Sequence, residues 1–300
     1  MKHLNTYENK SFNIKPMSSY ITEYIIKKKL EKPIDSEDHY EYFPKTTEEL
    51  VENIEELLNR DIYDLNCIDT SEITDMSYLF KKYANNVTNK IDVSGWNVSN
   101  VTNMKSMFYN CKEFNCDLSN WNVSKVINMN NMFCNCYKFN CDLSKWNVSN
   151  VTDMSSMFYI CESFEGKGLE NWDVSKTIWM NIMFYKCKNL NCDLSKWDVH
   201  NVKTMEYMFT WCDNFVGKGL ENWDVSNVEN MSYMFCNCYN FNSDLSNWKI
   251  DKCEDFNRIF ANCKNFNFEY VESWGKHIKT HANKDNMFYG MKNKPSWYEE

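Results

Sequence analysis

The chain has little glycine and proline, with 7 and 4 of these residues among 300. Flexible linkers and low-complexity segments are rich in both residues, so the composition excludes these classes. No stretch approaches the roughly 18 consecutive apolar residues of a membrane-spanning helix. Met1–Lys15 also has no apolar core of the kind that a secretory signal contains. We therefore expect no membrane insertion, and we favour a cytoplasmic location.

Basic residues are outnumbered by acidic ones, 33 to 42, which gives a net charge of −9. Binding to nucleic acid without sequence preference requires a basic surface that neutralises phosphates, so we expect no nucleic-acid partner. The one dense basic run, Lys27 to Lys29, lies in a short amphipathic stretch and is interpreted as a solvated face.

Sequence motifs of catalysis are also missing. The chain has no G-x-S-x-G, no H-E-x-x-H and no phosphate-binding glycine loop. His277 and His281 are four residues apart, as in some metal sites, but no carboxylate or cysteine follows at a matching offset. We predict no catalytic residue, no metal and no cofactor, and we interpret the two histidines as a chance pair.

What the chain does contain is a repeat of 25 or 26 residues, marked by a column of tryptophans: Trp96, Trp121, Trp146, Trp172, Trp197, Trp223, Trp248 and Trp274. After Trp121, the residues Met129, Met132, Phe133 and Cys136 have the i, i+3, i+4, i+7 spacing of one helix face. Trp121 and Val123 alternate as in a strand. The pattern predicts about eight coils, each with a short strand and a short helix, stacked into an α/β repeat solenoid.

The run from Trp96 to Cys111 reads Trp-Asn-Val-Ser-Asn-Val-Thr-Asn-Met-x-x-Met-Phe-x-x-Cys. It resembles the repeat of the BspA-type leucine-rich-repeat surface proteins, and the resemblance covers residues 61 to 275. It implies a leucine-rich-repeat-like solenoid with a role in recognition or adhesion, and it supplies no catalytic residue. One departure is Val126, which stands where leucine-rich repeats usually have asparagine.

The repeat divides the chain into four parts. Residues 1–43 show no periodicity, and the sequence predicts neither order nor disorder for them. Residues 44–66 contain the capping-box pattern Thr46 to Glu49, which predicts a helix over about 47–59 that caps the first coil. The solenoid occupies residues 67–274, and residues 275–300 form a C-terminal cap or tail. Two coils have one extra residue, which we expect paired glycines to absorb as a bulge: Gly166 with Gly168, and Gly217 with Gly219.

Two columns are interpreted as structural. The cysteine column is predicted to be a buried thiol ladder, because cysteine behaves as a small apolar residue; it comprises Cys111, Cys136, Cys161, Cys187, Cys212, Cys238 and Cys263. Disulfides between coils or metal binding are the alternatives, but no pair has structural-zinc spacing. The tryptophan column shares the side of the core valines, and its alternative is a stacking platform for sugars or bases.

A third set of residues is the candidate binding site. The predicted outer helix face is polar in the early coils and becomes apolar in the middle ones, at Ile160, Trp179, Ile182, Tyr207, Trp211 and Tyr233. Exposed apolar patches often mark interaction sites. We expect a non-enzymatic recognition scaffold with a protein partner. Two alternatives stay open: an architectural spacer without a specific ligand, and a patch covered by Phe288 and Trp297 of the C-terminal tail.

Overall fold

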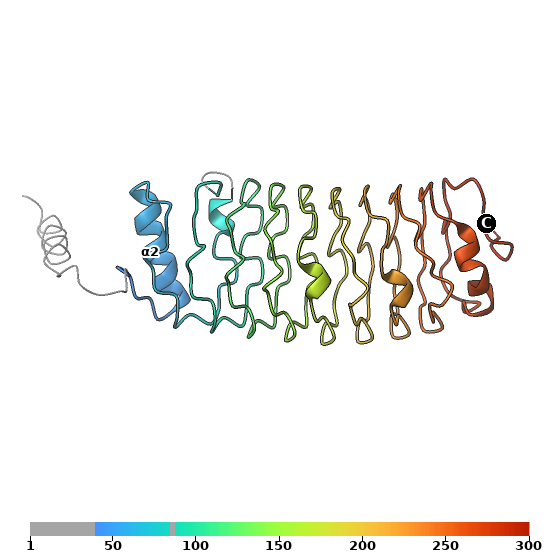
Figure 1. Ribbon diagram of the computed structural model, residues 1–300, viewed down its shortest axis with the longest axis horizontal. Coiled ribbons are helices and arrows are strands. Elements are labelled where there is room, and N and C mark those ends of the chain that lie inside the picture. Colours follow the sequence, from blue (N-terminus) through green and yellow to red (C-terminus); the bar gives the residue numbers. More distant parts are fainter. Residues whose placement is uncertain (1–39, 85–87, 300) are drawn as a thin grey trace, which may run out of the picture. The chain divides into compact units, whose positions relative to one another are not determined.

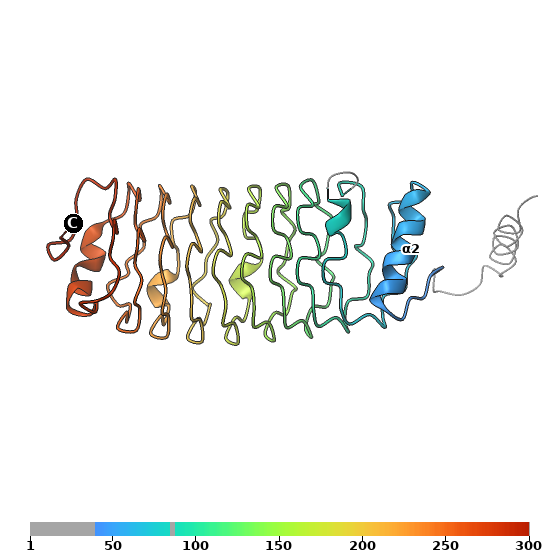
Figure 2. The same ribbon diagram turned by 180° about the vertical axis from the view of Figure 1, so that it is seen from behind.

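Each repeat forms one coil of the chain, and successive coils lie side by side in sequence order (Figures 1 and 2). This computed structural model describes residues 40–84 and 88–299, within the compact unit Tyr40–Glu300. Neighbouring coils are joined by parallel β-bridges at one recurring position, which link Asp75, Asn103, Asn128, Asp153, Trp179, Thr204, Asn230, Asp255 and Asn283 in turn. The basic run Lys27 to Lys29 and residues 1–39 of the N-terminal segment lie outside the described residues.

The predicted α/β fold with a strand and a helix in every coil is wrong. Residues 40–84 and 88–299 contain isolated bridges but no strand or sheet. Their helices are the α-helix α2 (Thr47–Asn59) and four 3-10 helices: η1 (Lys81–Tyr83), η2 (Leu169–Asn171), η3 (Leu220–Asn222) and η4 (Phe268–Lys276). Most of each coil consists of turns and short extended pieces, so the strand-and-helix unit of leucine-rich repeats is not present.

Hydrogen bonding explains why the predicted helix does not form. In the coil after Trp96, the Met107 amide donates to Met104 O, three residues back, at 3.2 Å, as in a turn. The next amide, that of Phe108, instead donates to Met132 O of the following coil at 2.9 Å. Ser106 and Asn110 have left-handed backbones, with φ of +54° and +63°. Two successive turns of this kind reproduce the i, i+3, i+4, i+7 spacing, so the apolar pattern alone does not distinguish them from a helix.

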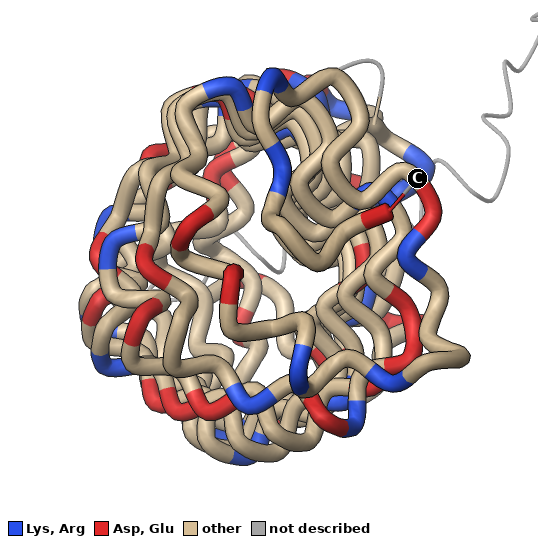
Figure 3. Tube along the Cα trace, turned by 90° about the vertical axis from the view of Figure 1, so that its right-hand side faces the viewer, with Lys and Arg blue, Asp and Glu red and all other residues tan. Residues whose placement is uncertain are grey.

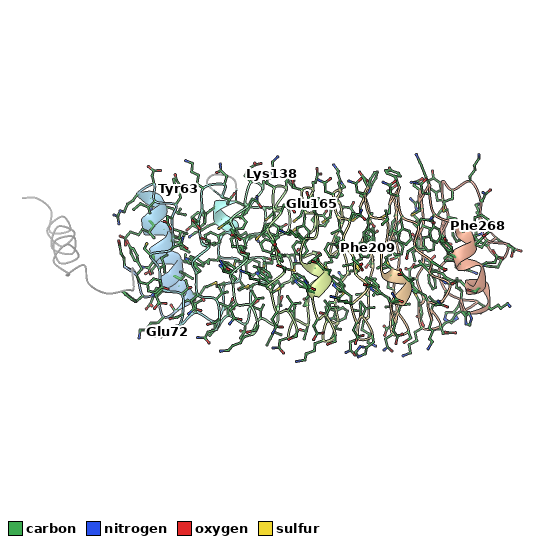
Figure 4. The ribbon with its side chains drawn as sticks, in the orientation of Figure 1. Tyr63, Glu72, Lys138, Glu165, Phe209 and Phe268 are labelled. Atoms are coloured by element: carbon green, nitrogen blue, oxygen red, sulfur yellow. The ribbon has the colours of Figure 1, made fainter. Side chains whose placement is uncertain are left out.

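The apolar side chains of these turns fill the interior of the stack. Met104, Met107, Phe108 and Cys111 are completely buried. The phenylalanines stack on one another from coil to coil, as Phe108 does on Phe133 with ring centres 5.6 Å apart. The equivalent Phe209, labelled in Figure 4, is also completely buried, and Lys138 lies at the edge of the stack. Charged residues of both signs are distributed around the outline of the coils (Figure 3).

The two ends of the stack are covered differently. At the N-terminal end, α2 (Thr47–Asn59) buries Leu50, Ile54 and Leu57, and Thr46 caps it by accepting from the Glu49 amide. This helix has the bounds that the capping-box pattern predicts. At the C-terminal end, η4 carries Trp274 into the tryptophan column, where this side chain is fully buried.

The paired glycines have left-handed backbones that suit the extra residue of their coils. Gly166 and Gly168 have φ of +85° and +96°. A β-carbon on Gly168 would lie 2.2 Å from the backbone nitrogen of Ser144 in the preceding coil. Only glycine fits this approach, and the chain then enters η2 (Leu169–Asn171) before Trp172.

Candidate interaction surface

The tryptophan column lies inside the stack and is therefore not a platform for an external ligand. Each of the eight tryptophans of this column is at most 4% exposed. The indole N–H donates to a backbone carbonyl of the preceding coil, as Trp146 Nε1 does to Leu118 O at 2.9 Å. From Trp146 onward the rings also stack in sequence, for example Trp146 on Trp172 with centres 6.4 Å apart. These contacts tie each coil to the one before it.

The cysteine column runs parallel to the tryptophans, and each thiol lies near a carbonyl of the preceding coil. Cys187 Sγ is 3.0 Å from Phe158 O, and Cys212 Sγ is 3.0 Å from Phe184 O. All seven members are fully buried, and no disulfide links them. Burial raises the pKa of the Cys111 thiol to about 12 and that of Cys136 well above its usual value. The thiols are therefore protonated, and they act as hydrogen-bond donors within the core.

Metal-ligating side chains do not converge in the part of the chain that the structure describes, where no group of three or more could hold an ion. His277 Nδ1 lies 3.3 Å from Asp251 Oδ1 of the preceding coil, and the His281 side chain is exposed. Among the same residues, no helix is long and apolar enough to span a membrane.

All six residues of the predicted patch lie at the surface, although not on a helix. Five of them are partly exposed and have left-handed backbones, while Trp179 occupies a bridge position and is 46% exposed. Ile182, Tyr207 and Tyr233 follow one another in the same column, ten residues after a tryptophan. Tyr207 and Tyr233 stack with ring centres 4.5 Å apart. The other column is less continuous, because Lys186 separates Ile160 from Trp211.

The structure adds aromatic residues that the helical interpretation missed. Tyr159 and Tyr185 stack with ring centres 5.0 Å apart, and Tyr185 meets Tyr207 edge-on at 6.3 Å. Arg258 lies over the Tyr233 ring at 5.9 Å. We call the row Tyr159, Tyr185, Tyr207 and Tyr233 the tyrosine row. It crosses four consecutive coils, and two of its members, Tyr207 and Tyr233, belong to the predicted patch.

The environment of the tyrosine row is partly desolvated. Burial raises the pKa of the Tyr159, Tyr185 and Tyr207 phenols, so all three remain neutral hydrogen-bonding groups at physiological pH. Burial also raises the pKa of the neighbouring Glu206 carboxyl, and the Asp255 carboxylate adds to the shift. An apolar row with polar tips of this kind is typical of protein interfaces, where tyrosine is enriched.

The C-terminal tail packs on the end of the stack. Phe288 is buried against Phe260 with ring centres 5.6 Å apart, and Trp297 Nε1 donates to Val271 O at 3.1 Å. The Trp297 ring also contacts Phe288 edge-on. The tail therefore extends the core at the last coil, while Trp179 in the middle of the stack remains exposed.

The stacked coils define a repeat protein whose core is built from tryptophan, phenylalanine, methionine and cysteine columns. The family described as "Mycoplasma protein of unknown function, DUF285" matches the chain repeatedly, over residues 48–167, 74–196, 141–218 and 180–297. These matches span most of the chain, which belongs to this family. No curated protein matches the chain.

Proposed function

We propose that this protein is a non-enzymatic recognition scaffold, which binds another protein through the tyrosine row and the apolar residues around it. The observation that carries the proposal is the change in composition along a single surface column. Ten residues after each tryptophan, the early coils have Ser106, Asn131 and Ser156, whereas the next three have Ile182, Tyr207 and Tyr233. The early coils show that a polar residue can adopt the same backbone conformation at this position. Packing within the coil therefore does not require the change to apolar residues.

Backbone strain supports the same interpretation. Ile160 and Ile182 have φ of +57° and +62°. A left-handed backbone is unfavourable for β-branched residues and is adopted more readily by asparagine, which the equivalent positions Asn131 and Asn135 contain. Residues that are locally unfavourable cluster at functional sites. The isoleucines thus fit selection for a binding surface better than selection for stability.

The resemblance of the Trp96–Cys111 motif to BspA-type surface proteins also supports a recognition role, and we propose that the repeats are related. The alternative of an architectural spacer predicts exposed columns that stay polar and uniform along the stack. The polar-to-aromatic change in the middle coils favours a binding role over that alternative.

A pair of charge substitutions, Trp179→Asp together with Trp211→Asp, tests the proposal. The structure should tolerate both, because the Trp179 column holds Asp153 and Asp255, and the Trp211 column holds asparagine in four other coils. We expect a melting temperature within a few degrees of wild type, since a surface substitution usually changes stability by about 0.5 kcal/mol or less. Proteins captured from a cell lysate by the immobilised wild-type chain should not bind to this variant.

A matched control carries the same charges in the same two columns of an earlier coil, as Asn128→Asp with Asn135→Asp. We expect it to retain every captured protein. If the tryptophan variant captures the same proteins as wild type, or if the control loses them equally, then the middle coils are not the binding surface. A large loss of stability in the tryptophan variant alone would show that these side chains are structural.

A further inference from the structure

The direction of the hydrogen bonds between coils differs from one side of the stack to another. At the bridge positions an amide donates back to the preceding coil, as Thr152 does to Ile127 O at 2.9 Å. Along one side of each coil, every second amide donates to a carbonyl of the following coil. In the last such pair, Phe256 donates to Asn283 O at 2.8 Å, Arg258 to Asp285 O at 3.1 Å, and Asn262 to Tyr289 O at 2.7 Å. On this side, the stack therefore ends in a row of carbonyls at its N-terminal end and a row of amide donors at its C-terminal end.

A helix covers the carbonyl row, whereas the C-terminal tail contacts the last coil through Tyr298, whose hydroxyl donates to Lys284 O at 3.2 Å and accepts from the Met287 amide. At the N-terminal end, α2 (Thr47–Asn59) lies over the first coil, and Thr47 Oγ1 donates to Asp75 O at 2.7 Å. At the C-terminal end, Lys284, Asn286 and Gly290 occupy the positions of Phe256, Arg258 and Asn262 one coil later. Their amides have no acceptor among residues 40–84 and 88–299. We call these three amides the open donor row.

The segment around the open donor row is basic, in contrast to the chain as a whole. Residues 276–294 contain five lysines and one aspartate, whereas the chain has a net charge of −9. Lys279 is paired with Glu254 of the preceding coil at 3.0 Å. Lys284 belongs to the open donor row, and Lys292 is exposed two residues beyond it. Both the charge and the unpaired donors at this end favour a ligand with negative charge and oxygen acceptors.

A hollow of about 290 Å³ lies beside Gly290. Its apolar lining comes from Phe266, Phe268 and Met291, and its charged lining from Lys264 and Lys292. No acidic side chain lines it. The hollow can hold one apolar side chain, and the two ammonium groups can contact a neighbouring carboxylate.

We propose that the C-terminal end of the stack binds an extended, acidic segment of a partner protein. Alternate carbonyls of this segment accept from the open donor row, an apolar side chain enters the hollow, and carboxylates pair with Lys264, Lys284 or Lys292. Main-chain hydrogen bonds then provide affinity and the side-chain contacts provide selectivity, as in strand addition. A second copy of this chain does not fit, because α2 covers the carbonyl row that it would have to present. This site is separate from the tyrosine row and does not rest on the function proposed above.

The test uses the full chain and a fluorescein-labelled octapeptide of alternating glutamate and valine with neutral ends. We expect saturable binding by fluorescence anisotropy, and none for the matching lysine–valine octapeptide. In hydrogen–deuterium exchange, the bound peptide should slow exchange at residues 284–290 and leave the central coil at 129–136 unchanged. Exchange slows only where an amide gains a hydrogen bond or loses access to solvent, so this readout locates the segment.

Charge variants supply the matched comparison. Lys284→Glu with Lys292→Glu should weaken peptide binding at least tenfold. Lys138→Glu with Lys196→Glu, which adds the same charge on exposed positions of coils farther from this end, should weaken it less than threefold. Equal losses in both double variants would overturn the proposal. So would the absence of peptide binding, or protection elsewhere in the chain. Equal protection of residues 284–290 by heparin would show that any polyanion binds there, and would also overturn it.

Discussion

Ser156 provides a direct test of the left-handed turns. Its φ is +55°, and its amide donates to Asn181 O of the next coil at 3.0 Å. A left-handed backbone costs a residue with a β-carbon about 1–2 kcal/mol, and glycine avoids this cost. Glycine also increases the entropy of the unfolded chain, which offsets about 0.4–1 kcal/mol. The Ser156→Gly variant should therefore be more stable than Ser156→Ala by roughly 0.5–1 kcal/mol.

The helix expected from the apolar spacing predicts the opposite sign. In a helix interior, a glycine variant is less stable than an alanine variant by about 1 kcal/mol. The free-energy difference between Ser156→Gly and Ser156→Ala that a left-handed turn predicts therefore differs by roughly 1.5–2 kcal/mol from the difference that a helix predicts. The free energies come from urea unfolding followed by tryptophan fluorescence, with both variants measured under the same conditions. Comparing glycine with alanine cancels the loss of the serine hydroxyl.

Lys138 is the matched control position. It is exposed and is not among the residues with positive φ. Lys138→Ala should be at least as stable as Lys138→Gly, because glycine has no conformational advantage there. If Ser156→Gly is less stable than Ser156→Ala, the assignment of a left-handed turn at this position is wrong, and the reasoning for the equivalent columns fails with it.

Two further predictions concern the buried columns. Trp146→Ala should lower the free energy of unfolding by about 3–5 kcal/mol, because it opens a cavity between packed coils. Trp146→Phe should lower it by about 1 kcal/mol, mainly through loss of the indole hydrogen bond to Leu118 O. A loss of less than about 1 kcal/mol for the alanine variant in urea unfolding would place this side chain outside the core. The cysteine column should react slowly with a thiol reagent in the native protein and completely after denaturation. Burial raises the pKa of the Cys111 thiol to about 12 from an ordinary value of 9.0, so the folded state binds the proton more tightly. The stability that the buried thiol contributes is fully present below pH 9 and is lost as the pH rises towards 12. The urea concentration at the unfolding midpoint, measured as a function of pH, should fall over this range. An unchanged midpoint would contradict burial of the thiols.

The proposed binding surface was predicted only in part from the sequence. The composition of the columns identified Tyr207 and Tyr233, because their change from polar residues is visible in the repeat. Tyr159 and Tyr185 were missed because the predicted outer face comprised the positions 7, 10 and 14 residues after each tryptophan, and these two tyrosines lie 13 residues after theirs. In the stack, Tyr185 lies thirteen residues after its tryptophan and contacts Tyr207, which lies ten residues after the next one. A contact between residues at different repeat positions in neighbouring coils depends on the direction in which each turn orients its side chains.

The sequence by itself determined the repeat length, the buried columns, the bounds of α2 and the role of the paired glycines. Each of these depends on the conformational preferences of individual residues or on the pattern of apolar residues. Both signals occur in every repeat, so the sequence shows them several times. Only the tertiary structure decided the conformation of the coil. The spacing of Met129, Met132, Phe133 and Cys136 suits a helix or two turns equally well, and asparagine at positions 131 and 135 was the one local signal for left-handed turns. The turns prevail because alternate amides, such as that of Phe133, donate to the next coil, an acceptor that an isolated repeat does not have.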